Sequence, residues 1–332
     1  MTGVQTCALP ISKAAAGAPL IVASPYEWVA PHRIPPRKWI YGGHYARKFL
    51  SATVAPGGGG KSSLTIVEAL AITTGRPLLG VTPDERTAVW LWNGEDPLEE
   101  LQRRIVAAAL SHGVDPSEFE GRLFVDTGRD KKIIIASQTR NGVEIAQPLA
   151  DALVATIRQN GIGLLIIDPF VASHQVSEND NGAIEAVANE WAAIADATDC
   201  AVELVHHVRK TGGLAATVED GRGASALLAK VRSARVLNQM TEDESAKAGV
   251  DNRRLYFRVE NGKSNMSVPA DKSAWYRLAS QPLGNGPAKP LEGTGDTVGV
   301  VTTWSWPDPL ADVSVADLRR SEEHTSELQS RG

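Results

Sequence analysis

The sequence is poor in cysteine, in excess charge of one sign and in long apolar runs. Only Cys7 and Cys200 occur among 332 residues, too few for a zinc or iron–sulfur site built from cysteines or for a disulfide-stapled domain. The formal net charge is −5, so nucleic acid would have to bind through local basic patches. The longest apolar run, Gly163–Ile167, stops at Asp168. No segment is therefore expected to span a membrane.

The two ends of the chain are set apart from the rest. Met1–Ile11 and Arg320–Ser330 can be written as translations of the two complementary strands of one DNA segment, which resembles a sequencing-library adaptor. We therefore expect residues 1–12 and 320–332 to be artefacts of sequence assembly.

Composition divides what remains into three parts. Residues 13–280 have the pattern of one large domain, in which Cys200 is expected to be a buried thiol in a reducing compartment. Residues 281–297 are rich in Gly, Pro and polar residues and predict a linker. Residues 298–319 contain Trp304 and Trp306 and predict the start of a truncated C-terminal domain.

Apolar strand-like runs alternate with helix-period segments through the first two thirds of the chain. This alternation predicts an α/β fold with a parallel sheet flanked by helices. The later runs are short strands without long helices, which predicts β-hairpins added to the sheet edge. The predicted strands are 49–54, 87–92, 122–126, 163–168, 201–205, 233–240, 253–260 and 274–279, and the predicted helices are 61–74, 146–159, 183–198 and one capped by Asp96.

A glycine-rich segment follows the first predicted strand and opens a helix. It departs from the P-loop pattern G-x-x-x-x-G-K-[ST] only at Ala55. Backbone N–H groups around glycines can surround a phosphate, and the helix N-terminus adds positive potential. Lys61 is expected to reach the β- and γ-phosphates and Ser62 to bind Mg²⁺; a flexible Gly-rich turn is the alternative. The expected nucleotide-binding residues are Ala55, Pro56, Gly57, Gly58, Gly59, Gly60, Lys61, Ser62 and Ser63.

Three further positions lie where predicted parallel strands end, the edge at which open α/β sheets bind ligands. Asp168 ends an apolar strand, at the Walker B position, where a carboxylate holds the hydrated magnesium ion. The alternative is that Asp168 is an ordinary turn residue before Pro169. Glu95 follows the second strand and is a candidate general base. In this interpretation Asp96 is the N-cap of the next helix, with Pro97 at its first position and Glu99 completing a capping box.

His206 and His207 end the fifth parallel strand. Adjacent strand residues face opposite sides of a sheet, so only one of them can point toward the phosphates. A metal-binding pair is therefore not expected, and one histidine is a candidate sensor of the γ-phosphate, against the alternative of an ordinary core or surface histidine.

Taken together, five segments resemble the RecA-like ATPases, and within them the RepA-type hexameric plasmid replicative helicases. The resemblance covers about residues 35–278. The segments that carry it, in chain order, are Ala55–Ser63, Trp92–Arg104, Ile166–Pro169, His206–Lys210 and Gly221–Ala226.

The resemblance implies a role for each matching residue. Ser62 and Asp168 would hold magnesium, Glu95 would be the base and His207 the sensor. Arg232 would be an arginine finger acting on the neighbouring subunit's nucleotide, with Lys263 as a second cation acting in trans. The alternative is that Arg232 and Arg235 lie on the polar face of an edge strand.

The segment Thr211–Gly223 has no periodicity and is expected to be a mobile loop. By the same resemblance it lines a ring channel, where Arg209, Lys210 and Arg222 would contact the phosphates of single-stranded DNA.

The sequence thus predicts a cytoplasmic ATPase that uses ATP and Mg²⁺ and forms a homo-oligomer, a hexameric ring. Its expected activity is that of a replicative DNA helicase of a plasmid, phage or mobile element, with a replication initiator or primase as a further partner. The alternative from another class is a recombinase-like module in which nucleotide controls DNA binding or assembly without unwinding. A monomeric small-molecule kinase is a third and weaker interpretation.

Overall fold

The computed structural model describes residues 23–208, 215–220, 224–267, 273–287 and 295–307. Two units are distinguished. Residues up to Pro36 form one, and its described part has a single 3₁₀ turn, η1 (Pro31–Arg33). The second unit begins at Arg37 and contains every other element described below, so this compact unit starts later than the expected residue 13.

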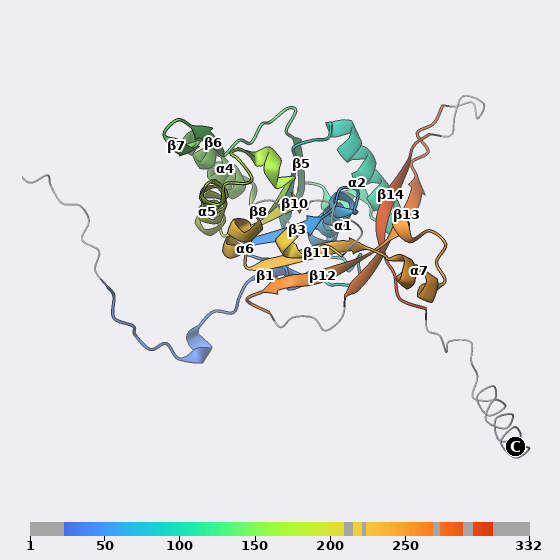
Figure 1. Cartoon of the computed structure of the whole chain (residues 1–332), viewed down its shortest axis with the longest axis horizontal. Helices are drawn as coiled ribbons and strands as arrows, with labels where there is room; N and C mark the ends of the chain where they lie inside the picture. The colour runs from blue at the N-terminus through green and yellow to red at the C-terminus, as the bar shows by residue number, and fades with distance from the viewer. Residues whose placement is uncertain (1–22, 209–214, 221–223, 268–272, 288–294, 308–332) are drawn as a thin grey trace, which may run out of the picture. The chain divides into compact units, whose positions relative to one another are not determined.

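A nine-stranded sheet forms the centre of the second unit (Figure 1). Six of its strands are parallel neighbours in the order β11-β3-β10-β8-β4-β5. Because these strands run in one direction, their carboxyl ends meet at one edge. Their bounds are β3 (Leu50–Ala55), β4 (Ala88–Asn93), β5 (Leu123–Thr127), β8 (Ile162–Asp168), β10 (Ala201–His207) and β11 (Ser233–Gln239).

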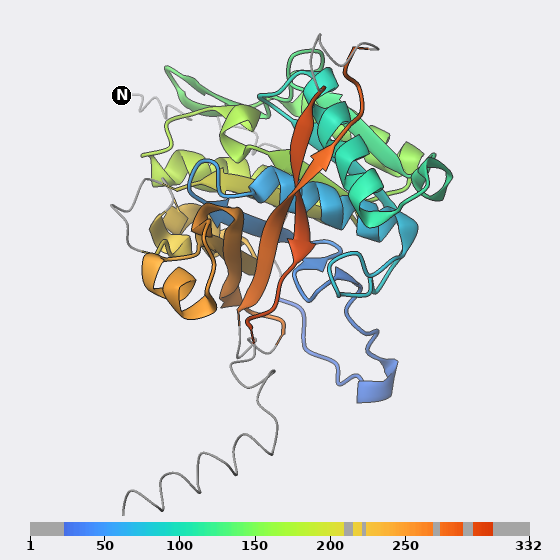
Figure 2. The same cartoon turned by 90° about the vertical axis from the view of Figure 1, so that its right-hand side faces the viewer.

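Helices cover both faces of this sheet (Figures 1 and 2). In β8, Leu164 and Ile166 pack on the side of α1, whereas Leu165 and Ile167 pack on the side of α4 and α5. Burial on both faces explains why this strand is a continuous apolar run, as parallel strands commonly are. The helices are α1 (Lys61–Thr74), α2 (Leu98–His112), α3 (Pro116–Phe119), α4 (Gln147–Asn160), α5 (Asn181–Thr198), α6 (Ala224–Lys230) and α7 (Glu242–Ala248).

Three antiparallel strands extend the sheet beyond β11, which confirms the expected added hairpins. They are β12 (Tyr256–Ser264), β13 (Ala274–Pro282) and β14 (Thr297–Thr303). The expectation of a linker at 281–297 followed by a new domain at 298 is wrong for the described residues, because β14 pairs with β13 and buries Val300 and Val301 in the core. A Gly/Pro-rich stretch looks the same in sequence whether it joins domains or adjacent strands.

Several short elements escaped the sequence analysis. The β1 (Trp39–Tyr41) and β2 (Tyr45–Ala46) strands pair with each other, and β6 (Ala136–Thr139), β7 (Gly142–Ile145) and β9 (His174–Gln175) form a separate three-stranded sheet. Strands of two to four residues are too short to show a period. The remaining 3₁₀ turns are η2 (Phe170–Ser173), η3 (Val218–Asp220) and η4 (Arg253–Leu255).

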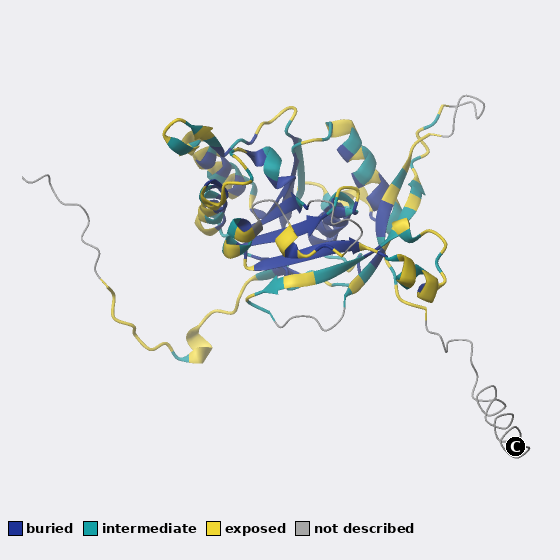
Figure 3. Cartoon of the chain, viewed as in Figure 1, coloured by how far each residue is buried: buried dark blue, intermediate teal, exposed yellow. Residues whose placement is uncertain are grey.

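Burial follows this architecture (Figure 3). The parallel strands β3, β4, β8, β10 and β11 are almost entirely buried, whereas the edge strand β5 is mostly half-buried. Cys200 is a fully buried free thiol, as expected. Among the described residues, no helix is long and apolar enough to cross a membrane.

Candidate nucleotide-binding site

The loop between β3 and α1 has the backbone that a phosphate cradle requires. Gly58 and Gly60 have φ angles of 75° and 84°, which L side chains rarely adopt, and a Cβ on Gly59 would lie 3.0 Å from the Pro56 carbonyl oxygen. Ala55 is the last residue of β3 and is fully buried. Because Ala55 continues the strand and has no positive φ, its position does not need the glycine of the P-loop pattern.

Lys61 is held in the centre of this loop. Its Nζ donates to the carbonyl oxygens of Ala55 and Pro56 at 3.0 and 3.1 Å and lies 3.1 Å from Nδ1 of His207. Burial lowers the pKa of Lys61 to about 8, and burial together with the Lys61 charge lowers the pKa of His207 to about 4. A neutral His207 that accepts this hydrogen bond at Nδ1 carries its proton on Nε2.

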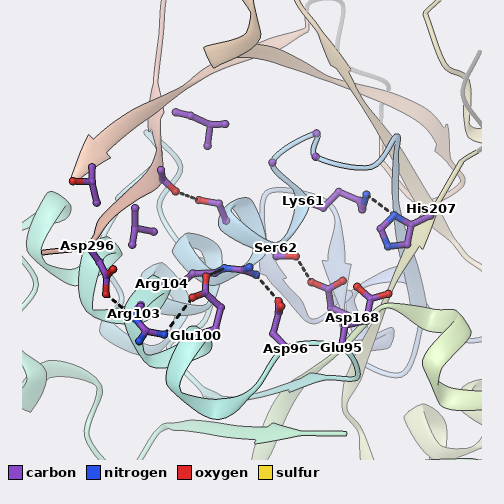
Figure 4. Close-up of a pocket in the computed structure, with 18 residues that line it drawn as sticks. Lys61, Ser62, Glu95, Asp96, Glu100, Arg103, Arg104, Asp168, His207 and Asp296 are labelled. Carbon is purple, nitrogen blue, oxygen red and sulfur yellow. Dashed lines mark hydrogen bonds and ion pairs between the residues drawn. The ribbon is translucent and has the colours of Figure 1, made fainter. Parts of the chain in front are cut away.

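Ser62 and Asp168 form the second pair of the site (Figure 4). The Ser62 hydroxyl donates to Oδ2 of Asp168 at 2.6 Å, and Asp168 is only 4% exposed at the end of β8. Burial raises the pKa of Asp168 to about 6. A hydroxyl and a buried carboxylate are the hard oxygen donors that Mg²⁺ prefers, so these two residues fit the magnesium site expected from the sequence.

Glu95 reaches the same place from β4. Asn93 pairs with Asp168 across the two strands, and Figure 4 shows the exposed Glu95 carboxylate beside that of Asp168. The Asn93 side chain accepts hydrogen bonds from the backbone N–H groups of Glu95 and Asp96 at 2.9 and 2.7 Å. This short turn aims Glu95 toward the phosphate loop, where a base would have to act.

The capping box predicted for the following helix is wrong. The N-cap of α2 is Pro97, and no side chain caps the helix. The Asp96 carboxylate instead accepts from Nη1 of Arg104 at 2.8 Å, and the Asp96 backbone N–H donates to Asn93.

A cavity of about 690 Å³ opens in front of the loop. Arg103 closes one side by donating to Oδ2 of Asp296 at 2.9 Å, and Ser63 Oγ donates to the Gly299 carbonyl at 3.0 Å. The sequence analysis missed most of this wall, because it comes from a helix surface and from β14, far along the chain. The lining residues are Gly58–Ser63, Glu95, Asp96, Glu100, Arg103, Arg104, Asp168, His207, Leu278 and 296–299.

The cavity therefore brings together Lys61, Ser62, Glu95, Asp168 and His207, as the sequence predicted. Ala55, Pro56 and Gly57 do not line it; the first two contribute carbonyl groups to Lys61 instead. His206 faces away from the cavity: it is buried, with its ring centroid 6.0 Å from that of Phe170.

Arg232 and Lys263 lie at the opposite edge of the sheet. The Arg232 backbone N–H donates to Leu50 O at 2.9 Å, at the start of β3, roughly 16 Å along the strand from the phosphate loop. Arg232 is exposed, and Lys263 Nζ donates to the Leu228 carbonyl. Lys263 is opposite Ala234 in the pairing of β11 with β12, so it lies at the same edge as Arg232, and partial burial together with the Arg232 charge lowers the pKa of Lys263.

The three predicted DNA contacts, Arg209, Lys210 and Arg222, lie outside the described residues. The described centre of their segment, residues 215–220, is anchored: Asn238 hydrogen-bonds both the N–H and the carbonyl of Ala216, at 2.7 and 2.9 Å, and Val218 is buried. The described part of the predicted loop 211–223 contains one short 3₁₀ turn, η3, and the rest of that prediction lies outside the described residues.

Comparison with known proteins agrees with this site. A family model described as "AAA domain" matches residues 21–213, more than half of the chain, so the chain belongs to this family. This match supports a P-loop ATPase domain, and the expected fold class, a mostly parallel α/β sheet flanked by helices, is confirmed. Among solved structures, the crystal structure of the RadB recombinase is similar, with 15% sequence identity, a TM-score of 0.47, and coverage of 71% of this chain and 89% of that chain.

Proposed function

We propose that this protein is a magnesium-dependent ATPase of the RepA helicase type, whose subunits form a ring and complete one another's active sites. The observation that carries the proposal is the separation of catalytic groups. Lys61, Glu95 and Asp168 line the cavity, whereas Arg232 and Lys263 lie at the far edge of the same sheet. Cations at that edge lie too far from the nucleotide of their own subunit, which supports a role at a nucleotide bound by another subunit.

Within one subunit the chemistry divides among a few groups. Lys61 would exchange its carbonyl partners for phosphate oxygens, and the N–H groups of Gly58–Gly60 would bind the same phosphates. Glu95 accepts the proton of the attacking water as general base, and the Nε2–H of His207 donates to a phosphate oxygen. Magnesium, held by Ser62 and Asp168, would supply positive charge to the β- and γ-phosphates. Arg232 of the next subunit stabilises charge that develops during transfer.

The expected task is ATP-driven movement on single-stranded DNA during replication of a plasmid, phage or other mobile element in the cytoplasm. Arg209, Lys210 and Arg222 contact DNA phosphates without regard to sequence. A replication initiator or primase would load or follow such a motor.

The first test measures ATPase rate of the full chain with and without single-stranded DNA, together with its mass in solution with nucleotide. A ring-sized particle, stimulated by DNA and able to separate a forked duplex, supports the proposal. A DNA-binding oligomer that hydrolyses ATP but separates no duplex supports the recombinase-like alternative. A monomer with DNA-independent turnover contradicts both.

Two substitutions test the shared active site. Lys61→Ala is expected to abolish turnover, whereas Arg232→Ala retains nucleotide binding and loses hydrolysis by roughly 10³-fold or more, the range for arginine fingers. Measurement of nucleotide affinity and turnover on the same preparation separates the two effects. Normal hydrolysis by Arg232→Ala would show that the assignment of Arg232 is wrong.

A further inference from the structure

A cluster of polar side chains is buried behind the phosphate loop, between α1 and the sheet. Its centre is a bidentate ion pair, in which Nη1 and Nη2 of Arg235 donate to Oε1 and Oε2 of Glu68, each at 2.6 Å. Arg235 is 6% exposed and Glu68 is 2% exposed. Arg235 also donates to the Thr53 hydroxyl at 2.8 Å and to the Tyr45 hydroxyl at 3.0 Å.

The cluster continues to the neighbouring strand through a second buried carboxylate. Glu203 of β10 accepts hydrogen bonds from the hydroxyls of Ser51 and Thr53, and its Oε2 lies 3.2 Å from Nε2 of His44. The other ring nitrogen of His44 lies 2.7 Å from the Ser233 hydroxyl. Ser233 and Arg235 both lie on β11, so the series of contacts begins and ends on this strand. We call the residues of this series the Arg235 network: His44, Tyr45, Ser51, Thr53, Glu68, Glu203, Ser233 and Arg235.

The network joins the elements that carry the catalytic groups. Glu68 lies on α1, two helical turns after Lys61. Glu203 precedes His207 on β10 by four residues. Arg235 and Ser233 follow Arg232 at the start of β11, within three residues of it. The helix that follows the phosphate loop, the strand that carries His207 and the strand that follows Arg232 are thus linked by one set of buried hydrogen bonds.

Stability alone is a weak reason for such a network. Burying an ion pair removes two charges from water, and well-packed apolar side chains of similar volume commonly stabilise a fold as well or better. What a bidentate pair supplies in addition is fixed geometry, because two parallel N–H···O bonds hold the planar guanidinium and the carboxylate in a defined relative orientation.

We propose that Arg235 is a positioning residue for hydrolysis in the neighbouring subunit. Through its pairing with Glu68 it fixes the start of β11 against the phosphate-loop helix, so that Arg232 is presented to the next subunit's nucleotide. This inference rests on the proposed function, because it assigns Arg232 to a site in trans.

The structure offers a control pair with two hydrogen bonds, although it is less buried, with side chains 15% and 36% exposed. Arg47 and Glu85 form a similar two-point pair, with Nε and Nη2 of Arg47 donating at 2.8 and 2.6 Å. Its other hydrogen bonds go to the carbonyl of Asp199 and the hydroxyl of Thr87. None of these residues belongs to α1, β10 or β11.

The test compares Arg235→Lys and Glu68→Gln with Arg47→Lys and Glu85→Gln in the full chain. Both network variants are expected to bind nucleotide within about twofold of the parent and to lose at least about tenfold in kcat, since they displace an arginine finger without removing it. The control variants are expected to keep kcat within about twofold. Glu68→Gln preserves side-chain shape and carries the test if Arg235→Lys folds poorly. An unchanged kcat in the folded network variants, or an equal loss in the controls, overturns the inference.

Mixing subunits separates positioning in trans from damage within one subunit. Lys61→Ala subunits have an inactive site but an intact Arg232, whereas Arg235→Lys subunits have an intact phosphate loop. Random equal mixing should place a working pair at about a quarter of all sites, several-fold above the rate of either variant alone. Absence of this recovery overturns the inference.

The same mixing with Arg232→Ala in place of Arg235→Lys tells the two proposals apart. Recovery with Arg232→Ala but not with Arg235→Lys overturns the positioning role alone. No recovery with either variant shows that Arg232 does not act in trans, and the proposed function then fails with the inference.

Discussion

Asp168 is a buried carboxyl group whose ionisation is unfavourable in the protein without nucleotide. Burial raises its pKa from 3.8 to about 6, although the Ser62 hydroxyl and the Lys61 ammonium both oppose that rise. The folded protein therefore binds a proton at Asp168 more tightly than the unfolded chain does. Its contribution to stability is present at low pH and is lost as the pH rises through about 4 to 6.

This sign gives a prediction for Asp168→Asn. Without nucleotide and magnesium, the substitution should raise the free energy of unfolding at about pH 7.5 by about 1–3 kcal/mol, because it removes a buried charge and keeps an acceptor for Ser62. Urea unfolding at two pH values checks it. The gain should be smaller by about 1 kcal/mol at pH 5, where the parent carboxyl is largely protonated. Magnesium-dependent hydrolysis should be lost. A gain that does not depend on pH would contradict the raised pKa.

Gly94 controls where Glu95 points. A Cβ on Gly94 would overlap the Ala172 side chain and lie 2.9 Å from the Trp92 ring. Gly94→Ala is therefore expected to displace the turn that aims Glu95, lowering kcat by about 10²-fold or more with little change in nucleotide affinity. Steady-state kinetics and nucleotide titration check this.

The matched control for that variant is Gly182→Ala. Gly182 lies in the first turn of α5 and a Cβ there has an ordinary contact at 3.4 Å. This substitution should leave kcat unchanged and keep or slightly raise stability. Equal kinetic effects of the two alanines would show that Gly94 has no special role in placing Glu95.

Among the elements, β14 connects the three added antiparallel strands, β12 to β14, to the nucleotide site. Figure 2 shows the β13–β14 hairpin crossing over α1, and Ser63 Oγ links the helix to Gly299 O and Val301 N, at 3.0 and 3.3 Å. The same strand supplies cavity-lining residues 297–299. Packing of this strand on α1 therefore shapes one wall of the cavity.

Val301→Ala tests that packing. Val301 is fully buried in the cluster that contains α1 and α2, so losing two methyl groups should lower the free energy of unfolding by about 1–3 kcal/mol. Nucleotide affinity should fall with it, because the cavity wall loosens. Thr303→Ala on the same strand removes an exposed side chain and should change stability by less than about 0.5 kcal/mol. Chemical unfolding and nucleotide titration decide the outcome.

The predictability of the elements depended on their length and on which contacts fixed them. The bounds of α1 follow from the phosphate loop and agree with the expected 61–74. The start of α2 was misplaced because Asn93 holds Glu95 and Asp96 in a turn before the helix, and the N-cap is Pro97. That contact depends on a turn geometry that composition does not reveal.

For the whole molecule, the proposal predicts that the affinity for single-stranded DNA falls as the salt concentration rises. In a plot of the logarithm of the DNA-binding constant against the logarithm of the salt concentration, the loss of one phosphate contact with single-stranded DNA should make the negative slope shallower by about 0.7. We expect Arg209→Ala, Lys210→Ala and Arg222→Ala each to produce about this change, equally for different DNA sequences. Fluorescence anisotropy over a salt series checks it.

Lys131→Ala is the control for that series. Lys131 pairs with Asp126 at 2.7 Å, close to the edge strand β5, and should not alter the slope. Slopes unaffected by any of the three loop variants would remove these residues from the DNA interface.

The order of motifs along the chain determined the class of the protein, because strand-to-helix spacing and the P-loop residues act locally. It also indicated Lys61, Ser62, Glu95, Asp168 and His207, since each follows a parallel strand and parallel strands end at one edge. Only the tertiary structure decided that β14 closes the cavity and that Arg235 is buried against Glu68 rather than on the polar face of an edge strand. Those contacts join residues more than a hundred positions apart, and no local pattern encodes which distant side chains meet.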